Sequence, residues 1–310
     1  MNILIAGASG FIGSELANYL SQNHKVTVLG RTLGKLESFS KDISRITWDN
    51  LSLQDAKQYE LIINLSGSSI GAKRWSLKVK KELIESRTET NRQLIEWLIH
   101  HQAKPRFFCA NAIGIYGAQE FSEDSFDEKS PLPESSADFL QQIGLLWEQS
   151  LNSAIAAGIA VTTLRLGVVL KQGEGMLKKL ELPFRLGLGS VLGSGQQALS
   201  WIYFKDLINV IDFLITHQEV TGPVNITSPC PVTQQEFAQT LAKALRRPVF
   251  LKTPGFVINA LFGEMGDYLL LKGQRVVPKR LNELGFKFSY PKIEAVLLEE
   301  FHKESIHKDK

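Results

Sequence analysis

The chain has 310 residues, of which 44% are hydrophobic and 22% are charged, and its formal net charge is +3. This composition is that of an ordinary soluble protein, and the length allows one large α/β domain with a smaller appended part. The sequence has no basic stripe with interleaved aromatic residues, and no apolar run as long as a membrane span. We therefore expect neither a nucleic-acid partner nor a membrane partner.

The two cysteines and six histidines lack the spacing of metal ligands. We therefore expect no metal site, and we interpret the cysteines as thiols in a reducing compartment. The first apolar strand starts at the N-terminus and leaves no room for a signal peptide, so the expected location is the cytoplasm.

Residues 1–31 are the most informative segment. An apolar strand leads into a G-x-x-G-x-x-G turn, an amphipathic helix follows, and a second apolar strand runs from Lys25. This order is typical of the βαβ unit that binds a dinucleotide. The glycines allow a sharp turn and a close approach of backbone to phosphate, and free amides at the helix start favour an anion. The predicted cofactor contacts are Gly7, Ser9, Gly10, Phe11, Ile12 and Gly13, with an ordinary structural turn as the alternative.

The end of the second strand indicates which nicotinamide cofactor is bound. An acidic residue there would hydrogen-bond the ribose 2′-hydroxyl of NAD. This chain has Arg31 and Thr32 instead, with Lys35 close behind. A guanidinium and a hydroxyl suit a 2′-phosphate, so the sequence predicts NADP rather than NAD. The alternative is a solvated surface arginine.

Further buried strands are predicted over 61–65, 106–110 and 161–166, and less clearly over 43–48, with helices over 77–101 and 137–157 between them. This alternation predicts a doubly wound parallel (Rossmann) sheet of the α/β class. After residue 166 the pattern changes to a glycine-rich region, a strand over 200–203, a helix over 205–216, a strand over 223–226 and further helices, the last from 292. We predict a Rossmann domain over 1–170, with 199–227 returning to its sheet, and a smaller C-terminal substrate lobe over 171–198 and 228–310.

Several motifs recur together along nearly the whole chain. They include the glycine turn, Asn64-Leu-Ser-Gly-Ser-Ser-Ile70, Asn111-Ala-Ile-Gly-Ile-Tyr-Gly117, Arg165-Leu-Gly-Val-Val-Leu170, Gly193-Ser-Gly-Gln196 and Val277-Pro-Lys-Arg-Leu281. In this combination the chain resembles the atypical extended short-chain dehydrogenase/reductases of the NAD(P)-dependent epimerase/dehydratase group. More narrowly, it is similar to the nucleoside-diphosphate-sugar epimerase-like subfamily with a C-terminal domain of unknown function.

The resemblance implies roles for further residues. The adenosine side of the cofactor would be lined by Leu65, Ser66 and Gly67. The alternative is that these residues form only a strand end and a turn. Ala110 and Asn111 would lie near the nicotinamide. The residues that would face the substrate cleft are Arg185, Gln196 and Trp201.

The usual catalytic pattern of that family is absent. Its Tyr-x-x-x-Lys motif belongs on the helix that starts near Phe139, which contains neither residue, and Ala112 stands where Ser or Thr is usual. Tyr116 could serve as an acid instead, or could be a packed tyrosine with a bonded hydroxyl. Asn111 could donate to a substrate oxygen, or could cap a turn.

Two arginines could hold an anionic substrate. Arg74 and Arg87 suit that role, with surface arginines at a helix start as the alternative. Two functions stay open: an NADP-dependent oxidoreductase or epimerase acting on an alcohol or carbonyl, including a sugar nucleotide, and a non-catalytic NADP(H)-binding redox sensor. The expected partner is a small-molecule substrate, and the resemblance also allows a homodimer.

Overall fold

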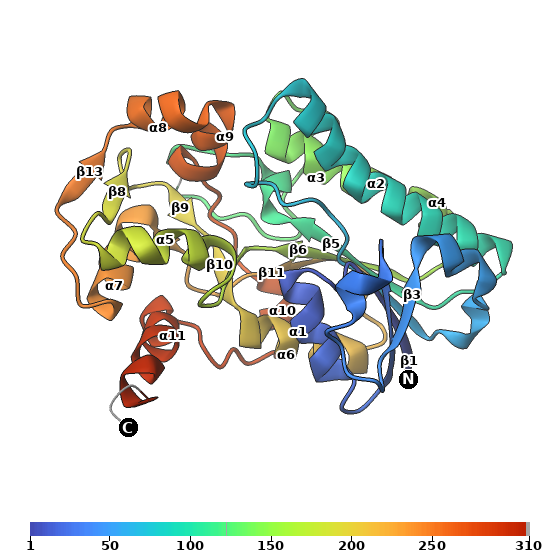
Figure 1. Ribbon diagram of the computed structural model, residues 1–310. Coiled ribbons are helices and arrows are strands. Elements are labelled where there is room, and N and C mark those ends of the chain that lie inside the picture. Colours follow the sequence, from blue (N-terminus) through green and yellow to red (C-terminus); the bar gives the residue numbers. More distant parts are fainter. Residues whose placement is uncertain (122, 308–310) are drawn as a thin grey trace.

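The computed structural model describes residues 1–121 and 123–307, with 303–307 described by their backbone only. Its centre is a seven-stranded sheet with the strand order β11-β6-β5-β4-β1-β2-β3, and every pairing in it is parallel (Figure 1). This is the predicted doubly wound α/β fold. The strands are β1 Asn2–Ala6, β2 Lys25–Gly30, β3 Ser44–Thr47, β4 Leu61–Asn64, β5 Arg106–Ala112, β6 Val161–Leu166 and β11 Gly222–Ile226.

Helices cover both faces of this sheet. On one face, α1 (Phe11–Leu20) and α6 (Phe204–Thr216) share an apolar core with the strands. The other face is packed by α2 (Leu77–His100), α3 (Phe139–Gln149) and α4 (Asn152–Ala156). Strands buried on both sides are mostly apolar, which explains why short apolar runs, and not alternating ones, marked β1, β2, β4 and β5 in the sequence.

The strand order reverses between β1 and β4. The chain passes from β1 outward to β2 and β3, and then returns to place β4 on the other side of β1. In open parallel sheets, ligands bind outside the carboxyl ends of the strands at such a reversal. The fold therefore places a binding site where the turn after β1 meets the loop after β4.

The C-terminal lobe has a core of its own. It is built from α5 (Gly175–Arg185), α7 (Gln234–Ala244), α11 (Ile293–His307) and parts of short strand pairs. The remaining helices are α8 Gly255–Phe262, α9 Glu264–Gly266 and α10 Lys279–Glu283. The short strand pairs are β7 Val168–Leu170 with β10 Trp201–Tyr203, β8 Ser190–Leu192 with β13 Leu251–Thr253, and β9 Ala198–Leu199 with β12 Val232–Thr233.

Two predicted elements differ from those observed. The helix expected over 137–157 is divided into α3 and α4 at Ser150 and Leu151, where Ser150 Oγ donates to the carbonyl of Trp147 and accepts from Asn91. The strand expected over 200–203 does not join the central sheet but pairs with β7. Of the segment 199–227, it is β11 that returns to the sheet, while α6 packs on its face.

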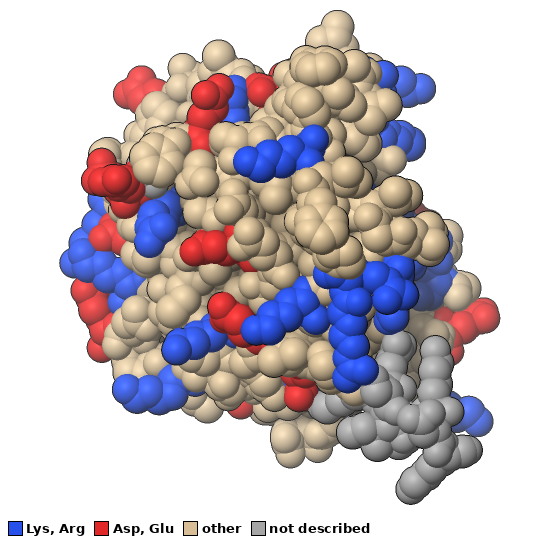
Figure 2. Space-filling view, turned by 90° about the vertical axis from the view of Figure 1, so that its left-hand side faces the viewer, with Lys and Arg blue, Asp and Glu red and all other residues tan. Residues whose placement is uncertain are grey.

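The outer face of the C-terminal lobe carries charges of both signs. Figure 2 shows lysine and arginine side chains gathered across the lower half of this face, with acidic side chains among them. Within the residues that the structure describes, no helix combines the length and the apolarity needed to cross a membrane.

Candidate cofactor and substrate site

The turn after β1 is too tight for any residue but glycine at two positions. Gly7 has a φ of +78°, and a Cβ placed on it would lie 2.7 Å from the backbone of Leu65 and Ser66. A Cβ on Gly13 would lie 2.5 Å from the carbonyl oxygen of Gly7. The two glycines therefore let the first turn of α1, the turn after β1 and the loop after β4 approach one another closely.

The start of α1 is open to a ligand. Its N-cap is Gly10, and no side chain caps the helix. The first-turn amides of Phe11, Ile12 and Gly13 have no intrahelical acceptor, and the positive end of the helix dipole adds to their attraction for an anion. This arrangement suits a diphosphate.

A cleft of about 620 Å³ opens in front of this helix terminus. Eight of the predicted cofactor contacts line it: Gly7, Ser9, Gly10, Arg31, Lys35, Leu65, Ser66 and Gly67. Phe11, Ile12 and Gly13 form the helix turn immediately behind it. The sequence interpretation missed the walls that the fold supplies from elsewhere, which include Trp48 and, on α2, Glu82, Glu85, Ser86, Glu89 and Thr90.

Two predicted cofactor contacts do not lie on this cleft. Thr32 is exposed and is the N-cap of the short helix Leu33–Leu36, outside the cleft wall. Ala110 is only 4% exposed and belongs to the core beneath α2 and α3. Asn111 and Ala112, the next two residues of β5, do line a pocket, the second one described below.

Two cations at the end of β2, Arg31 and Lys35, line the cleft. Arg31 is exposed, and neither it nor Lys35 has a hydrogen bond or ion pair to another described side chain. By contrast, two of the glutamates on the α2 wall form ion pairs with basic residues of the same helix. Glu89 lies 2.7 Å from Arg92, and Glu85 lies 3.6 Å from Lys81. The excess positive charge at the end of β2 fits an additional phosphate.

A buried hydroxyl faces the same cleft. Ser66 Oγ has no hydrogen-bond partner among the described residues, although Ser66 is only 8% exposed. A buried polar atom without a partner costs free energy, so such an atom at a cleft wall indicates a ligand contact. Together with the uncapped helix and the glycine turn, the residues present fit a dinucleotide.

A second pocket has a volume of about 310 Å³. It is bounded by the end of β5, one side of α3, the β6–β7 connection, and residues 268–274 of the C-terminal lobe. Its wall is mostly apolar, with Leu140, Ile143 and Trp147 from α3. Among the described residues of the chain, no three His, Cys, Asp or Glu side chains cluster as a metal site would need.

Arg87 on the wall of the second pocket is hydrogen-bonded to Ser68, a residue of the cleft wall. Its Nη2 donates to the carbonyl of Ser68 at 3.0 Å and its Nη1 to the carbonyl of Leu83 at 2.8 Å, while the guanidinium lies 4.9 Å from the ring centroid of Trp147. Burial lowers the pKa of Arg87 to about 10. Its Nε has no partner in the described part of the chain. Arg87 is thus a buried cation with a donor to spare on the wall of the second pocket.

The two predicted catalytic residues are both engaged in the fold. Tyr116 lies in the core outside both cavities. Its hydroxyl donates to Asn225 Oδ1 at 2.8 Å and accepts from Arg165 Nη1 at 2.7 Å, and burial raises its pKa. Asn111 does line the second pocket, but its Nδ2 donates to the carbonyl of Gly144 and its Oδ1 accepts from the amide of Ala112. The packed-tyrosine interpretation of Tyr116 therefore replaces the catalytic one.

Four of the five predicted substrate residues lie away from the second pocket. Arg74 donates at 3.5 Å to the carbonyl of Ala260, and Arg185 pairs with Glu181 on the exposed side of α5. The other two are Gln196, which is exposed on a turn, and Trp201, which is fully buried in the core of the C-terminal lobe and donates to the carbonyl of Cys230.

The pocket instead receives polar side chains that the sequence interpretation did not consider. Tyr268 and Lys272 line it, and so does Gln274, whose Nε2 is buried without a partner among the described residues. The spacing of Tyr268 and Lys272 is Tyr-x-x-x-Lys. That signal was visible in the sequence, but it lies far from the helix where the motif was sought.

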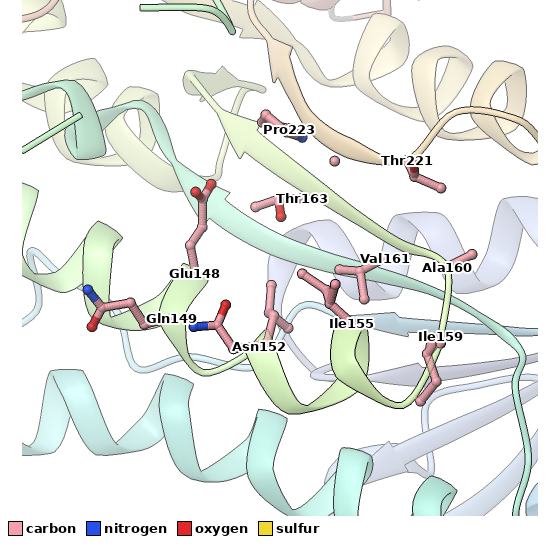
Figure 3. A pocket seen from close by; sticks show the side chains of 13 residues that line it. Glu148, Gln149, Asn152, Ile155, Ile159, Ala160, Val161, Thr163, Thr221 and Pro223 are labelled. Atoms are coloured by element: carbon pink, nitrogen blue, oxygen red, sulfur yellow. The ribbon is translucent and has the colours of Figure 1, made fainter. Parts of the chain in front are cut away.

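A larger cavity of about 640 Å³ lies elsewhere, between α3, α4 and the edge of the sheet. Figure 3 shows Gln149, Asn152 and Ile155 on its helical side and Val161 and Thr221 on its strand side. This hollow adjoins the amino ends of β6 and β11, whereas ligands of parallel sheets bind at the carboxyl ends. We therefore place the site in the cleft before α1 and in the second pocket, whose walls are joined by the hydrogen bond from Arg87 to Ser68.

Comparisons with known proteins agree with this geometry. A family model described as the NAD dependent epimerase/dehydratase family matches residues 3–227, and the model of a domain of unknown function, DUF1731, matches residues 253–300. The epimerase family protein YfhF of Bacillus subtilis is 34% identical, over 96% of this chain and 97% of its own length. The human epimerase family protein SDR39U1 is 34% identical, over 96% of this chain and 99% of its own length.

Solved structures show the same likeness. The crystal structure of human SDR39U1 (isoform 2) with NADPH superposes with a TM-score of 0.86 at 32% identity, covering 97% of this chain and 99% of that one. The nucleoside-diphosphate sugar epimerase from Corynebacterium glutamicum superposes with a TM-score of 0.73 at 25% identity, covering all of this chain and 61% of that one.

Proposed function

The chain belongs to the NAD dependent epimerase/dehydratase family, and from that premise we propose that it binds NADP(H) and supports hydride transfer on a small alcohol or carbonyl compound. The observation that carries the proposal is the uncapped start of α1 beside the unpaired Arg31. The relative whose crystal structure contains NADPH supports the choice of cofactor.

Each part of the cofactor would meet a defined part of this chain. The first-turn amides of α1 would hold the diphosphate, Arg31 and Lys35 the 2′-phosphate, and Ser66 and Gly67 the adenosine side of the cleft. When bound, the nicotinamide supplies or accepts a hydride. The chain itself would bind and orient the cofactor and the substrate, and would exclude water from the reacting groups.

The second pocket limits the other reactant. At about 310 Å³, with a largely apolar wall, it has the size and character of a site for a small organic molecule. The donors of Arg87 and Gln274 would face an oxygen of that molecule. By size and polarity, a small carbonyl compound with an apolar body fits this pocket better than a sugar nucleotide does.

A panel assay tests the proposal. The purified protein is mixed with NADPH and a series of aldehydes, ketones and sugar nucleotides, and loss of the reduced nicotinamide absorbance is followed. We expect turnover with at least one small carbonyl compound, and slower turnover in a Gly13→Ala control when NADPH is kept below the concentration that saturates that variant. NADPH oxidation no faster than in the control on every member would contradict the hydride-transfer function.

A non-catalytic NADP(H) sensor is the second candidate. On α3, where the family usually has its catalytic Tyr and Lys, Phe139 and Ile143 carry no exchangeable proton. The hydroxyl of Tyr116 is already hydrogen-bonded within the core. Both observations favour the sensor. Tight NADPH binding without turnover in the panel would select this function.

A further inference from the structure

Tyr268 and Lys272 bring an acidic hydroxyl and a cation to the second pocket from the C-terminal lobe. Tyr268 lies within the short helix Asp267–Leu271, which follows α9 directly, and Lys272 comes immediately after it. Both side chains line the pocket, together with Asn111 and Gly114 from the end of β5. The fold thus places them where a substrate would meet the carboxyl edge of the sheet.

The lysine is held close to the tyrosine ring. Lys272 Nζ lies 4.7 Å from the centroid of the Tyr268 ring and 2.7 Å from Asp267 Oδ2. The hydrogen bond to that carboxylate raises the pKa of Lys272. The ammonium therefore stays charged near neutrality and is a poor proton donor, and it lies over the face of the tyrosine ring.

An aromatic row fixes the tyrosine. Its ring stacks on Trp75 with centroids 6.3 Å apart and an interplanar angle of 23°, and Trp75 meets Phe139 edge-on at 4.8 Å. Trp75 is itself held by a hydrogen bond from Nε1 to the carbonyl of Ile70. Trp75 thus lies between Tyr268, which lines the pocket, and Phe139, which is buried in the core.

The other groups on the pocket wall are poorly suited to deliver a proton. Asn111 donates to Gly144, and Ser200 Oγ donates to the carbonyl of Gln274 at 2.8 Å. Arg87 keeps its charge at neutral pH even though burial lowers its pKa to about 10. The hydroxyl of Tyr268 makes no hydrogen bond to another described residue, so it is available to a ligand.

We propose that Tyr268 is a catalytic residue that exchanges a proton with the substrate oxygen, and that Lys272 is its positioning residue; this rests on the proposed function. In the reducing direction, the carbonyl carbon receives the hydride with its electron pair, and the π pair of the C=O bond moves to oxygen. That oxygen takes the phenolic proton of Tyr268, and the phenolate regains a proton from water. The reverse sequence oxidises an alcohol.

The test compares Tyr268→Phe with Tyr19→Phe, a matched control on α1 outside both cavities. For each variant we would measure turnover on the best carbonyl compound of the panel, NADPH affinity, and affinity for benzamide in the NADPH-loaded protein. Benzamide offers a carbonyl oxygen that is not reduced, so its affinity reports the phenol contact without turnover. Lys272→Met and Lys272→Arg test the ammonium.

We expect Tyr268→Phe to lower turnover by about 100-fold, the usual worth of a general acid. It should lower the affinity for benzamide by about fivefold, which is the effect of losing one hydrogen bond. NADPH affinity and the Tyr19→Phe control should not change. Lys272→Met should lower turnover by about tenfold, with Lys272→Arg restoring most of it, as expected for a charge effect.

Unchanged turnover in Tyr268→Phe would overturn the proposal. If the wild-type protein binds NADPH but reduces no carbonyl compound, the proposed function fails by itself, and benzamide then decides about Tyr268. Benzamide affinity that is equal in wild type and Tyr268→Phe, or no benzamide binding at all, would show that the phenol does not face a carbonyl oxygen.

Discussion

At Gly13 the space for a side chain is already taken by backbone. The carbonyl oxygen of Gly7 would lie 2.5 Å from a Cβ there, and no flexible side chain can move aside. By comparison, a Cβ on Gly34 would meet nothing within 4 Å. Glycine-to-alanine substitution at Gly13 therefore tests the close packing of the turn after β1, and the same substitution at Gly34 controls for the general effect of adding a methyl group.

We predict that Gly13→Ala weakens NADPH binding at least tenfold, because α1 must move away from the turn that holds its amides against the diphosphate. Gly34→Ala should bind NADPH like the wild type. Titration calorimetry measures both affinities. Equal affinity in Gly13→Ala and the wild type would show that the α1 terminus does not hold the cofactor.

For Tyr116 we expect substitution by phenylalanine to affect stability and not turnover, the reverse of what we expect for Tyr268. The hydroxyl of Tyr116 joins Arg165 to Asn225 inside the core, so Tyr116→Phe leaves two buried polar groups short of a partner. We expect a loss of about 1–3 kcal/mol in the free energy of unfolding, with turnover unchanged. Urea denaturation and the panel assay measure the two effects. A large loss of turnover in a stably folded Tyr116→Phe protein would return this tyrosine to the mechanism.

At the scale of elements, β5 carries a thiol whose protonation depends on the fold. Cys109 on β5 is fully buried, and burial raises its pKa to about 12. The native thiol keeps its proton at pH values where an unfolded thiol, with a pKa of about 8.5, has lost it. The contribution of Cys109 to stability is therefore complete below the unfolded pKa and is lost as the pH rises toward the folded one.

We predict that the stability advantage of the wild type over Cys109→Ala is smaller at pH 10 than at pH 8, as measured by urea unfolding at both pH values. In the native protein at pH 8, a thiol reagent should modify the exposed Cys230 and leave Cys109 intact. An advantage that grows with pH, or rapid modification of Cys109, would contradict the buried neutral thiol.

The elements also show what the sequence could predict. The phosphate turn is local: a strand, three glycines and a helix within the first 20 residues fix both its structure and its chemistry. The second pocket is not local, because it joins residues 111–114, 140–147 and 166–168 to 268–274. Trp201 illustrates the limit, since β10 pairs with β7 and not with the central sheet, which turns this aromatic residue into the core.

At the scale of the whole molecule, the C-terminal lobe is tied to the Rossmann domain beside the cleft. Lys80 on α2 pairs with Glu264 on α9 at 2.7 Å, and Lys179 on α5 donates to the carbonyl of Gly71 at 2.7 Å. These contacts join the loop after β4 and the start of α2 to the lobe that carries Tyr268. The second pocket is therefore lined by residues from two parts of one framework.

The most direct test of this account is calorimetric titration of the purified chain with NADPH and with NADH, repeated with Arg31→Ala. The account predicts one saturable site that binds NADPH at least tenfold more tightly than NADH, the worth of a charge-assisted contact to the 2′-phosphate. Arg31→Ala should remove most of that preference. No heat from either dinucleotide, or tighter binding of NADH, would contradict it.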